Sequence, residues 1–352
     1  MDKATVETSI KDKLDHQRAF WLRKNRRPVI GFTGTYFHAD SVKILDSHES
    51  VLRPEKIDVE RAVNHVDAEF ESWKDCTGDL FWSASPFQQF FGWLSAVLGG
   101  RLQIKADMIW CERFIDDYGR LADSKDEGWS ELLWALLDGL VERAAGRYPV
   151  APKAVLSPLG ILAEVRGNTE LAFDLTDRPH EVEAAIDAIT DAWVKLALGN
   201  FGHIPDWHGG YTSAPRYIWA PGRMIEFDED PAFMFSPQAH QRFVMPSHRK
   251  LMRHFDYPYI HLHSTQLHTL DSLLDLDELA AIELTPDYGE SIPDLVPTIA
   301  RIRERKPVIV HGFMTAEDMR TIVDQVPPEG LCLVSRVDAV EDALRLRDAL
   351  PR

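Results

Sequence analysis

Residues 280–313 read AAIELTPDYGESIPDLVPTIARIRERKPVIVHGF. The stretch begins with an apolar run of strand length, AAIELT (280–285), and ends with another, PVIVHGF (307–313). The segment between the two runs reads as a helix, because Ser291 and Asp294 have the spacing of a capping box. A strand, a helix and a second strand in succession predict a βαβ unit, whose strands are parallel and joined by a right-handed crossover.

The same alternation extends in both directions along the chain. Further strand-like segments are RPVIGFTG (27–34), DLFWSAS (79–85), DMIWCERF (107–114), KAVLSPLG (153–160), YPYIHLHS (257–264) and GLCLVSR (330–336). Long helical segments cover residues 127–148 and 180–200. About eight strands in 352 residues predict a (β/α)8 TIM-type barrel, residues 1–352 being a single domain with an N-terminal helical extension over 1–26. A doubly wound open sheet is the alternative, but no GxGxxG turn follows any of these strands.

Composition excludes several classes of partner. The formal net charge of −17 argues against binding to nucleic acid or to an anionic membrane. No apolar run reaches the roughly 18 to 20 residues that span a bilayer, and the charged N-terminus lacks the apolar segment of a secretory signal. Three scattered cysteines (Cys76, Cys111 and Cys332) do not form a disulfide framework, so a cytoplasmic location is expected.

Four segments, in order along the chain, resemble one known superfamily. They are MIWCERFIDD (108–117), LAEVRGNTELAFDLTDRPHEV (162–182), DEDPAFMFSPQAHQRFVMPSHRKL (228–251) and the strand IHLHS. Together they are similar to the uroporphyrinogen decarboxylase superfamily of barrels, which includes the corrinoid-linked methyltransferases. The resemblance implies a TIM-type barrel and an enzyme acting on a small molecule at one mouth of that barrel.

The sequence departs from both branches of that superfamily. The decarboxylases carry an RQAGRY segment and a Gly-His-Gly after the last strand, where this chain has LRKNRRPV and VSRVD. The methyltransferases hold zinc with His-x-Cys on the sixth strand and a cysteine near the eighth. Here the pair is His261-Leu262-His263, and Cys332 lies near the start of the last strand-like segment, where an inert core thiol is the plainer interpretation. The resemblance therefore ranks zinc-assisted methyl transfer first, tetrapyrrole decarboxylation second, and a non-catalytic binding barrel as the alternative of another class.

Strand periodicity selects the candidate site. Side chains alternate faces along a strand, so His261 and His263 share one face. The apolar neighbours of Glu283 and His311 belong to the opposite face, so these two side chains are also expected inside the barrel. Imidazole and carboxylate bind zinc and other divalent ions, which makes His261, His263, His311 and Glu283 the predicted metal ligands. The alternatives are a metal-free polar site and a purely structural buried cluster.

Other residues carry weaker signals. Asp230, in the acidic stretch Glu226 to Asp230, is the candidate general acid or base, with Glu283 as a second catalytic carboxylate. Arg166 is the candidate for binding a substrate carboxylate, although an ion pair explains it equally well. Some aromatic and histidine side chains are candidates for a pocket lining or a lid, with core packing and solvation as the alternatives: Trp82, Trp110, Tyr211, His203 and His208.

The expected partners follow from this ranking. They are a small-molecule substrate, a corrinoid protein and a second copy of the chain as a homodimer. The chain lacks the corrinoid signature Asp-x-His-x-x-Gly, so a corrinoid is expected only on a partner protein. The expected cofactor of the chain itself is a divalent metal, with zinc favoured.

Overall fold

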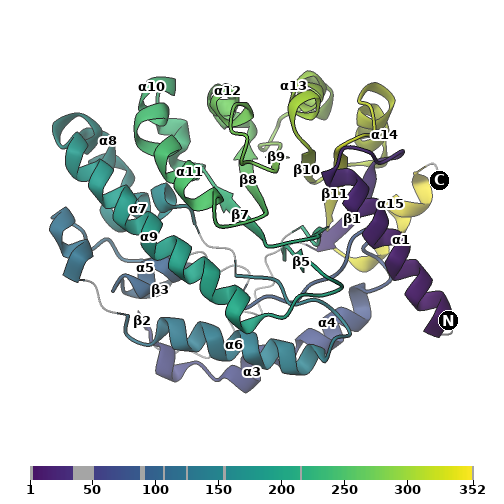
Figure 1. Cartoon of the computed structure of the whole chain (residues 1–352), viewed down its shortest axis with the longest axis horizontal. Coiled ribbons are helices and arrows are strands. Elements are labelled where there is room, and N and C mark those ends of the chain that lie inside the picture. The colour runs from purple at the N-terminus through teal and green to yellow at the C-terminus, as the bar shows by residue number, and fades with distance from the viewer. Residues whose placement is uncertain are drawn as a thin grey trace.

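The computed structural model describes residues 3–34, 51–87, 92–105, 108–123, 126–153, 156–214 and 216–350. Its centre is a parallel sheet in the order β1-β11-β10-β9-β8-β7 (Figure 1). The strands are β1 (Val29–Gly34), β7 (Met224–Asp228), β8 (Tyr257–His263), β9 (Ala281–Thr285), β10 (Val308–Gly312) and β11 (Leu331–Val337). Within the described residues this sheet does not close on itself. The predicted parallel α/β architecture is confirmed, and the closed eight-stranded barrel stays a prediction.

The C-terminal half follows the predicted alternation. The four strands predicted between residues 257 and 336 are present and pair in parallel with their neighbours in chain order. All five residues of β10 are buried, as expected for a strand covered on both faces. The helices between the strands are α10 (Pro237–Ala239), α11 (Met245–Met252), α12 (Leu270–Leu274), α13 (Ile292–Arg305), α14 (Ala316–Gln325) and α15 (Val340–Ala349). Figure 1 shows α10, α12, α13 and α14 in a row along the top of the view.

The first residues of two helices show where the local sequence was enough to predict how a helix begins. Thr315 caps α14, accepting a hydrogen bond from the Asp318 backbone N–H, and the Asp318 side chain completes a capping box. The capping box predicted from Ser291 and Asp294 is wrong, because the Ser291 side chain makes no cap hydrogen bond to α13. That helix begins at Ile292 and has Pro293 in its first turn, where the missing N–H of proline is tolerated.

The N-terminal half is mostly helical. Its helices are α1 (Lys3–Trp21), α3 (Val59–Val63), α4 (Val66–Trp73), α5 (Trp93–Val97), α6 (Trp129–Ala144), α7 (Pro158–Arg166), α8 (Asn168–Asp177) and α9 (Pro179–His203). Short strands are β2 (Val51–Leu52), β3 (Leu102–Lys105), β4 (Met108–Cys111), β5 (Tyr211–Thr212) and β6 (Trp219–Ala220). Short 3-10 helices cover Pro54–Lys56 and Tyr118–Asp123 here and Asp230–Met234 and Ser264–Thr269 in the C-terminal half, where His240–Val244 is π-helical. The helices predicted over 127–148 and 180–200, and the N-terminal helix, are confirmed as α6, α9 and α1.

Three upstream strand predictions are corrected. Within the predicted strand 107–114, the described residues Met108–Cys111 form β4, which pairs antiparallel with β3, because two strands so close in sequence can pair only in that direction. Residues 79–85 contain one isolated parallel bridge, between Ala84 and Val150. In 153–160 the described residues form no strand, since Ser157 caps α7 and Pro158 is its first residue. No helix in the described part of the chain is long and apolar enough to cross a membrane.

Candidate metal centre

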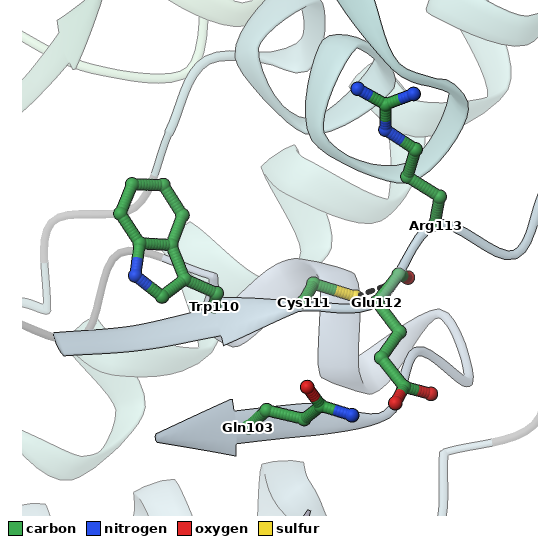
Figure 2. Close-up of a pocket in the computed structure, with 5 residues that line it drawn as sticks. All are labelled: Gln103, Trp110, Cys111, Glu112 and Arg113. Carbon is green, nitrogen blue, oxygen red and sulfur yellow. Dashed lines mark hydrogen bonds between the residues drawn. The ribbon is translucent and has the colours of Figure 1, made fainter. Parts of the chain in front are cut away.

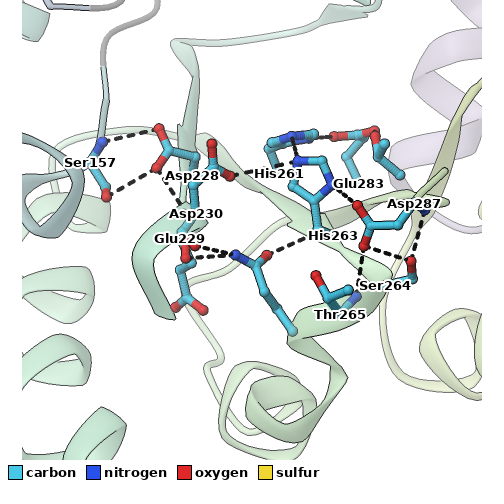
Figure 3. A network of polar contacts seen from close by, with 12 residues as sticks. Ser157, Asp228, Glu229, Asp230, His261, His263, Ser264, Thr265, Glu283 and Asp287 are labelled. Atoms are coloured by element: carbon cyan, nitrogen blue, oxygen red, sulfur yellow. Dashed lines mark hydrogen bonds and ion pairs between the residues drawn. The ribbon is translucent and has the colours of Figure 1, made fainter. Parts of the chain in front are cut away.

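The polar side chains of the sheet gather at the C-terminal ends of β7, β8 and β9. The strand register places His261 beside Asp228 on one side and beside Glu283 on the other. His261 and His263 lie on the same face of β8, as strand periodicity predicted, and their side chains point toward one another in Figure 3. In parallel α/β folds this end of the strands carries the reaction site.

Each histidine ring is oriented by a carboxylate. The Nδ1 of His261 forms a hydrogen bond with the Glu283 carboxylate, and the Nδ1 of His263 lies 2.9 Å from Oδ1 of Asp287 (Figure 3). Asp287 is fixed in turn by the Ser264 hydroxyl at 3.0 Å and the Thr265 N–H at 2.9 Å. A carboxylate on Nδ1 sets the tautomer and leaves Nε2 to face a ligand, which is the usual support of metal-binding histidines.

The Nε2 atoms of His261 and His263 lie close to each other and to a carboxylate oxygen of Asp230, which is a third possible ligand atom. Nε2 of His261 is 3.2 Å from Nε2 of His263, and Oδ1 of Asp230 is 3.8 Å from the same His263 atom. One ligand atom from each residue fits within a span of 4.8 Å. Two ligands at about 2.0 to 2.1 Å from a tetrahedral zinc would stand about 3.3 Å apart, so the two nitrogens are already at that spacing. The donor set of two imidazoles and one carboxylate therefore fits a divalent ion.

Two of the predicted ligands, Glu283 and His311, lie behind the side chains of Asp230, His261 and His263. The Glu283 side chain is completely buried and already bonds to His261, to Arg216 at 2.9 Å and to Thr285 at 2.7 Å. His311 Nδ1 lies 3.4 Å from Glu283 Oε1, deeper in the sheet. Glu283 lies beside His261 as strand periodicity predicted, and His311 lies beside Glu283. Among the described residues, the group that could hold a metal ion is Asp230, His261 and His263, and the part of Glu283 and His311 as ligands stays a prediction.

Arg216 is a buried arginine that the sequence analysis did not single out. It influences the charge of Glu283 and of the histidines beside it. Arg216 contacts Glu283, Nδ1 of His261 at 3.0 Å and Oε1 of Glu226 at 3.3 Å. Burial opposes ionisation of Glu283, but Arg216 and His261 outweigh it and hold the pKa of Glu283 well below its usual value. Burial likewise opposes a charged His261, yet Glu283 raises the pKa of His261 to about 9. Burial and Arg216 lower the pKa of His311 to about 3, so that ring is neutral.

The acidic stretch Glu226 to Asp230 lies at the C-terminal end of β7. Glu226 and Asp228 lie on β7, and Glu226 bonds to the Tyr259 hydroxyl and to Ser213 at 3.2 Å. Asp228 accepts the Ser157 N–H at 3.2 Å, at the start of α7 (Figure 3). Burial, with Asp230 nearby, raises the pKa of Asp228 to about 7.

The next residue along the stretch faces a different set of partners. Glu229 is fully buried, 2.9 Å from Nε2 of His240 and 3.0 Å from Nδ1 of His248. Burial opposes its ionisation, but His248 and His240 together lower the pKa of Glu229 to about 2. Its carboxylate also accepts a hydrogen bond from Thr269 at 3.3 Å. The charge on Glu229 therefore fastens the turn after β7 to the helices that cover it.

Arg166 and two of the aromatic candidates lie elsewhere. Arg166, at the C-terminal end of α7, donates to Asp174 at 2.7 Å, which is the ion pair left open by the sequence. The start of α7 touches Asp228, so its nine residues carry Arg166 roughly 13 Å away from the centre. Trp82 and Tyr211 pack in aromatic clusters. Arg166 therefore matches the ion-pair alternative, and its binding of a substrate carboxylate stays a prediction.

The remaining candidates also lie apart from the histidines. Trp110 lines a surface pocket of about 590 Å³ beside β3 and β4, with Gln103, Cys111, Glu112 and Arg113 (Figure 2). His203 stacks on Trp134 and contacts Asp138 at 2.9 Å, and His208 packs against Trp207. Cys332 is completely buried, in agreement with an inert core thiol.

Two solved structures share the fold. A methyltransferase from Methanosarcina mazei superposes with a TM-score of 0.64 over 96% of this chain and 97% of its own, at 11% sequence identity. A B12-independent methionine synthase from Shewanella sp. W3-18-1, in complex with selenomethionine, gives 0.52 over 85% of this chain and 87% of its own, at 10% identity. Both have TIM-barrel-type folds. No protein-family model and no curated protein matches the sequence. At these identities the likeness establishes the fold, and membership of the decarboxylase superfamily stays a prediction.

Proposed function

We propose that this protein is a methyltransferase that binds one divalent metal ion through Asp230, His261 and His263. The observation that carries the proposal is the convergence of two histidine Nε2 atoms, 3.2 Å apart, with a carboxylate beside them. Each histidine has a carboxylate on its other nitrogen, an arrangement that orients metal ligands. The methyltransferase of similar fold supports the choice of reaction.

Three protein ligands leave one coordination position open, which is the pattern of a catalytic rather than a structural zinc site. When bound there, zinc would lower the pKa of a thiol, and the resulting thiolate is the nucleophile that accepts a methyl group. Asp230 and His263 are partly exposed, so a substrate can approach from solvent, whereas Glu283 below them is closed to water. The methyl donor in this proposal is a methylated small molecule or a corrinoid carried by a partner protein.

The residues that would hold the ion must also balance its charge. Asp230 supplies one negative charge directly, and Glu283 and Asp287 supply two more through the histidines. Because Glu283 raises the pKa of His261 to about 9, binding at neutral pH requires that this ring loses a proton. Affinity is therefore expected to fall on acidification.

Metal content tests the site directly. We expect about one zinc, iron, cobalt or manganese ion per chain in wild-type protein purified without chelator or reconstituted with each metal. Asp230→Ala and the double variant His261→Ala, His263→Ala should lose it, because only one or two ligands then remain. His180→Ala is the matched control, since His180 is an exposed histidine on α9. A wild type that holds none of the four ions after reconstitution would contradict the proposal.

Methyl transfer is tested separately on protein whose metal content is known. Methylcobalamin as donor and a panel of small thiols as acceptors give an absorbance change when the methyl group leaves cobalt. We expect turnover in the wild type and in His180→Ala, and a loss of at least about 100-fold in Asp230→Ala. A metal-loaded protein that transfers the methyl group of methylcobalamin to none of these thiols would instead favour the binding barrel.

A further inference from the structure

One buried glutamine joins the two segments that carry the candidate ligands. Gln266, in the 3-10 turn Ser264–Thr269, is 1% exposed and uses both ends of its amide. Its Nε2 donates to the backbone carbonyls of Glu229 at 2.8 Å and Asp230 at 3.0 Å. Its Oε1 accepts the backbone N–H of His263 at 2.8 Å. Two of the three partners are carbonyl acceptors and one is an N–H donor, so only one orientation of this amide satisfies all of them.

We propose that Gln266 is a positioning residue that holds Asp230 at ligand distance from His263. The inference rests on the proposed metal site. Asp230 follows β7 and His263 ends β8, so the distance between these ligands depends on how the turn after β7 sits against the end of β8. The Gln266 amide bridges these two backbone segments directly, at the two ligand residues themselves.

The contacts of the Asp230 side chain are too weak to fix its position, so its position depends on how its backbone is held. The Asp230 side chain is half exposed, and its contact with His263 at 3.8 Å is too long for a hydrogen bond. Its own N–H reaches Asp228 Oδ1 at 3.4 Å, which is also a weak contact. On the other side of the turn, the Glu229 carboxylate is fastened to His240 and His248. The turn after β7 is thus held on one side by the Glu229 carboxylate and on the side of the candidate metal ligands by the Gln266 amide.

The same two segments are also joined farther from the ligands. His268 lies with Nε2 at 3.2 Å from the Ala232 carbonyl and 2.9 Å from the Phe235 carbonyl. This second connection has the same chemistry, a side-chain nitrogen on two carbonyl oxygens, but it engages neither Asp230 nor His263. His268 is therefore a matched control for loosening the contact between the turns without releasing the ligands.

The experiment compares Gln266→Leu, Gln266→Glu and His268→Leu. Leucine keeps approximate size and removes all three hydrogen bonds, while glutamate keeps the acceptor for His263 and turns an anion toward two carbonyl oxygens. Zinc and cobalt affinities are measured by competition with a chromophoric chelator, and Tm is measured on the metal-free proteins. We expect both Gln266 variants to bind metal about 10- to 100-fold more weakly, and His268→Leu to stay within about threefold of wild type.

Hydrogen–deuterium exchange on the metal-free proteins separates this inference from the proposed function. Gln266→Leu should raise exchange in residues 229–235 and at His263, because the bridge between them is lost. If the wild type binds no ion, the metal site fails, and unchanged exchange in Gln266→Leu would sink the positioning role as well. Gln266 variants with a lower Tm but wild-type metal affinity, or a His268→Leu protein that loses affinity equally, would reduce Gln266 to ordinary packing.

Discussion

At the scale of single residues, the site depends on a buried charge balance. Glu283 and Arg216 are both almost completely buried, and each would be costly to bury alone. Their pairing, with His261 as a third charged partner, allows a carboxylate to stand under the two histidines. The histidine pair is thus supported by a charge arrangement that needs all three side chains.

Glu283→Gln should lower the free energy of unfolding by about 3 kcal/mol, because Arg216 and His261 lose their buried counter-charge. The pKa of His261 in the folded protein, about 9, exceeds its ordinary value of 6.5. Its stabilising contribution is therefore complete below about pH 6.5 and is lost as the pH rises toward 9. The difference from wild type should shrink between pH 6 and pH 10 in urea unfolding.

Glu181→Gln, an exposed carboxylate on α9, is the control and should change stability by less than about 0.5 kcal/mol at every pH. A difference between Glu283→Gln and wild type that stays constant from pH 6 to pH 10 would contradict the assignment of a charged His261 to this pair.

At the scale of secondary-structure elements, packing distances decide which positions tolerate change. Helix α9 contains two glycines three residues apart, Gly199 and Gly202. A Cβ on Gly199 would stand 2.3 Å from the Trp134 ring of α6, whereas one on Gly202 would meet nothing within 4 Å. The two helices therefore approach closely at Gly199 and not at Gly202.

Gly199→Ala should destabilise the protein by about 1 to 3 kcal/mol, because the Trp134 ring must move and its stacking on His203 is disturbed. Gly202→Ala should be neutral or stabilise it by up to about 1 kcal/mol, since alanine loses less backbone entropy on helix formation. Thermal unfolding of both variants checks the pair. An equal Tm for the two would show that α6 and α9 are not in close contact.

At the scale of the whole molecule, strands from the N-terminal and C-terminal regions of the chain lie side by side in the sheet. β1, from the N-terminal region, pairs in parallel with β11, which lies between β1 and β10. The side chain of Asn25 strengthens this junction by bonding to the Pro328 carbonyl at 2.6 Å and to the Gly330 N–H at 2.7 Å. The last strand therefore has a neighbour on each side, β1 and β10, although it comes near the end of the sequence.

A chain ended after Pro328 should fail to unfold cooperatively, because β1 loses the strand with which it pairs in the described sheet and β10 loses one of its two neighbours. A chain ended after Val337 keeps β11 and loses α15, in which Ala343 is the fully buried residue, so it should fold with a reduced Tm. Far-UV circular dichroism during heating distinguishes the two. A cooperative transition in the shorter chain would mean that the sheet does not depend on β11.

The sequence by itself determined the parallel alternation from residue 257 onward and the shared face of His261, His263 and Glu283. These features depend on apolar runs and on the period of two along a strand, which are local properties. It did not predict the strand at 224–228, because Asp and Glu disfavour strands and pairing with β8 is what makes this segment extended. The tertiary structure alone brought Arg216 and Asp287 to the histidines, joined Gln266 to Asp230, and made Asp230 the third ligand candidate. Those contacts join separate segments of the chain, and a side chain's partner across such a distance is set by packing of the whole fold rather than by its neighbours in sequence.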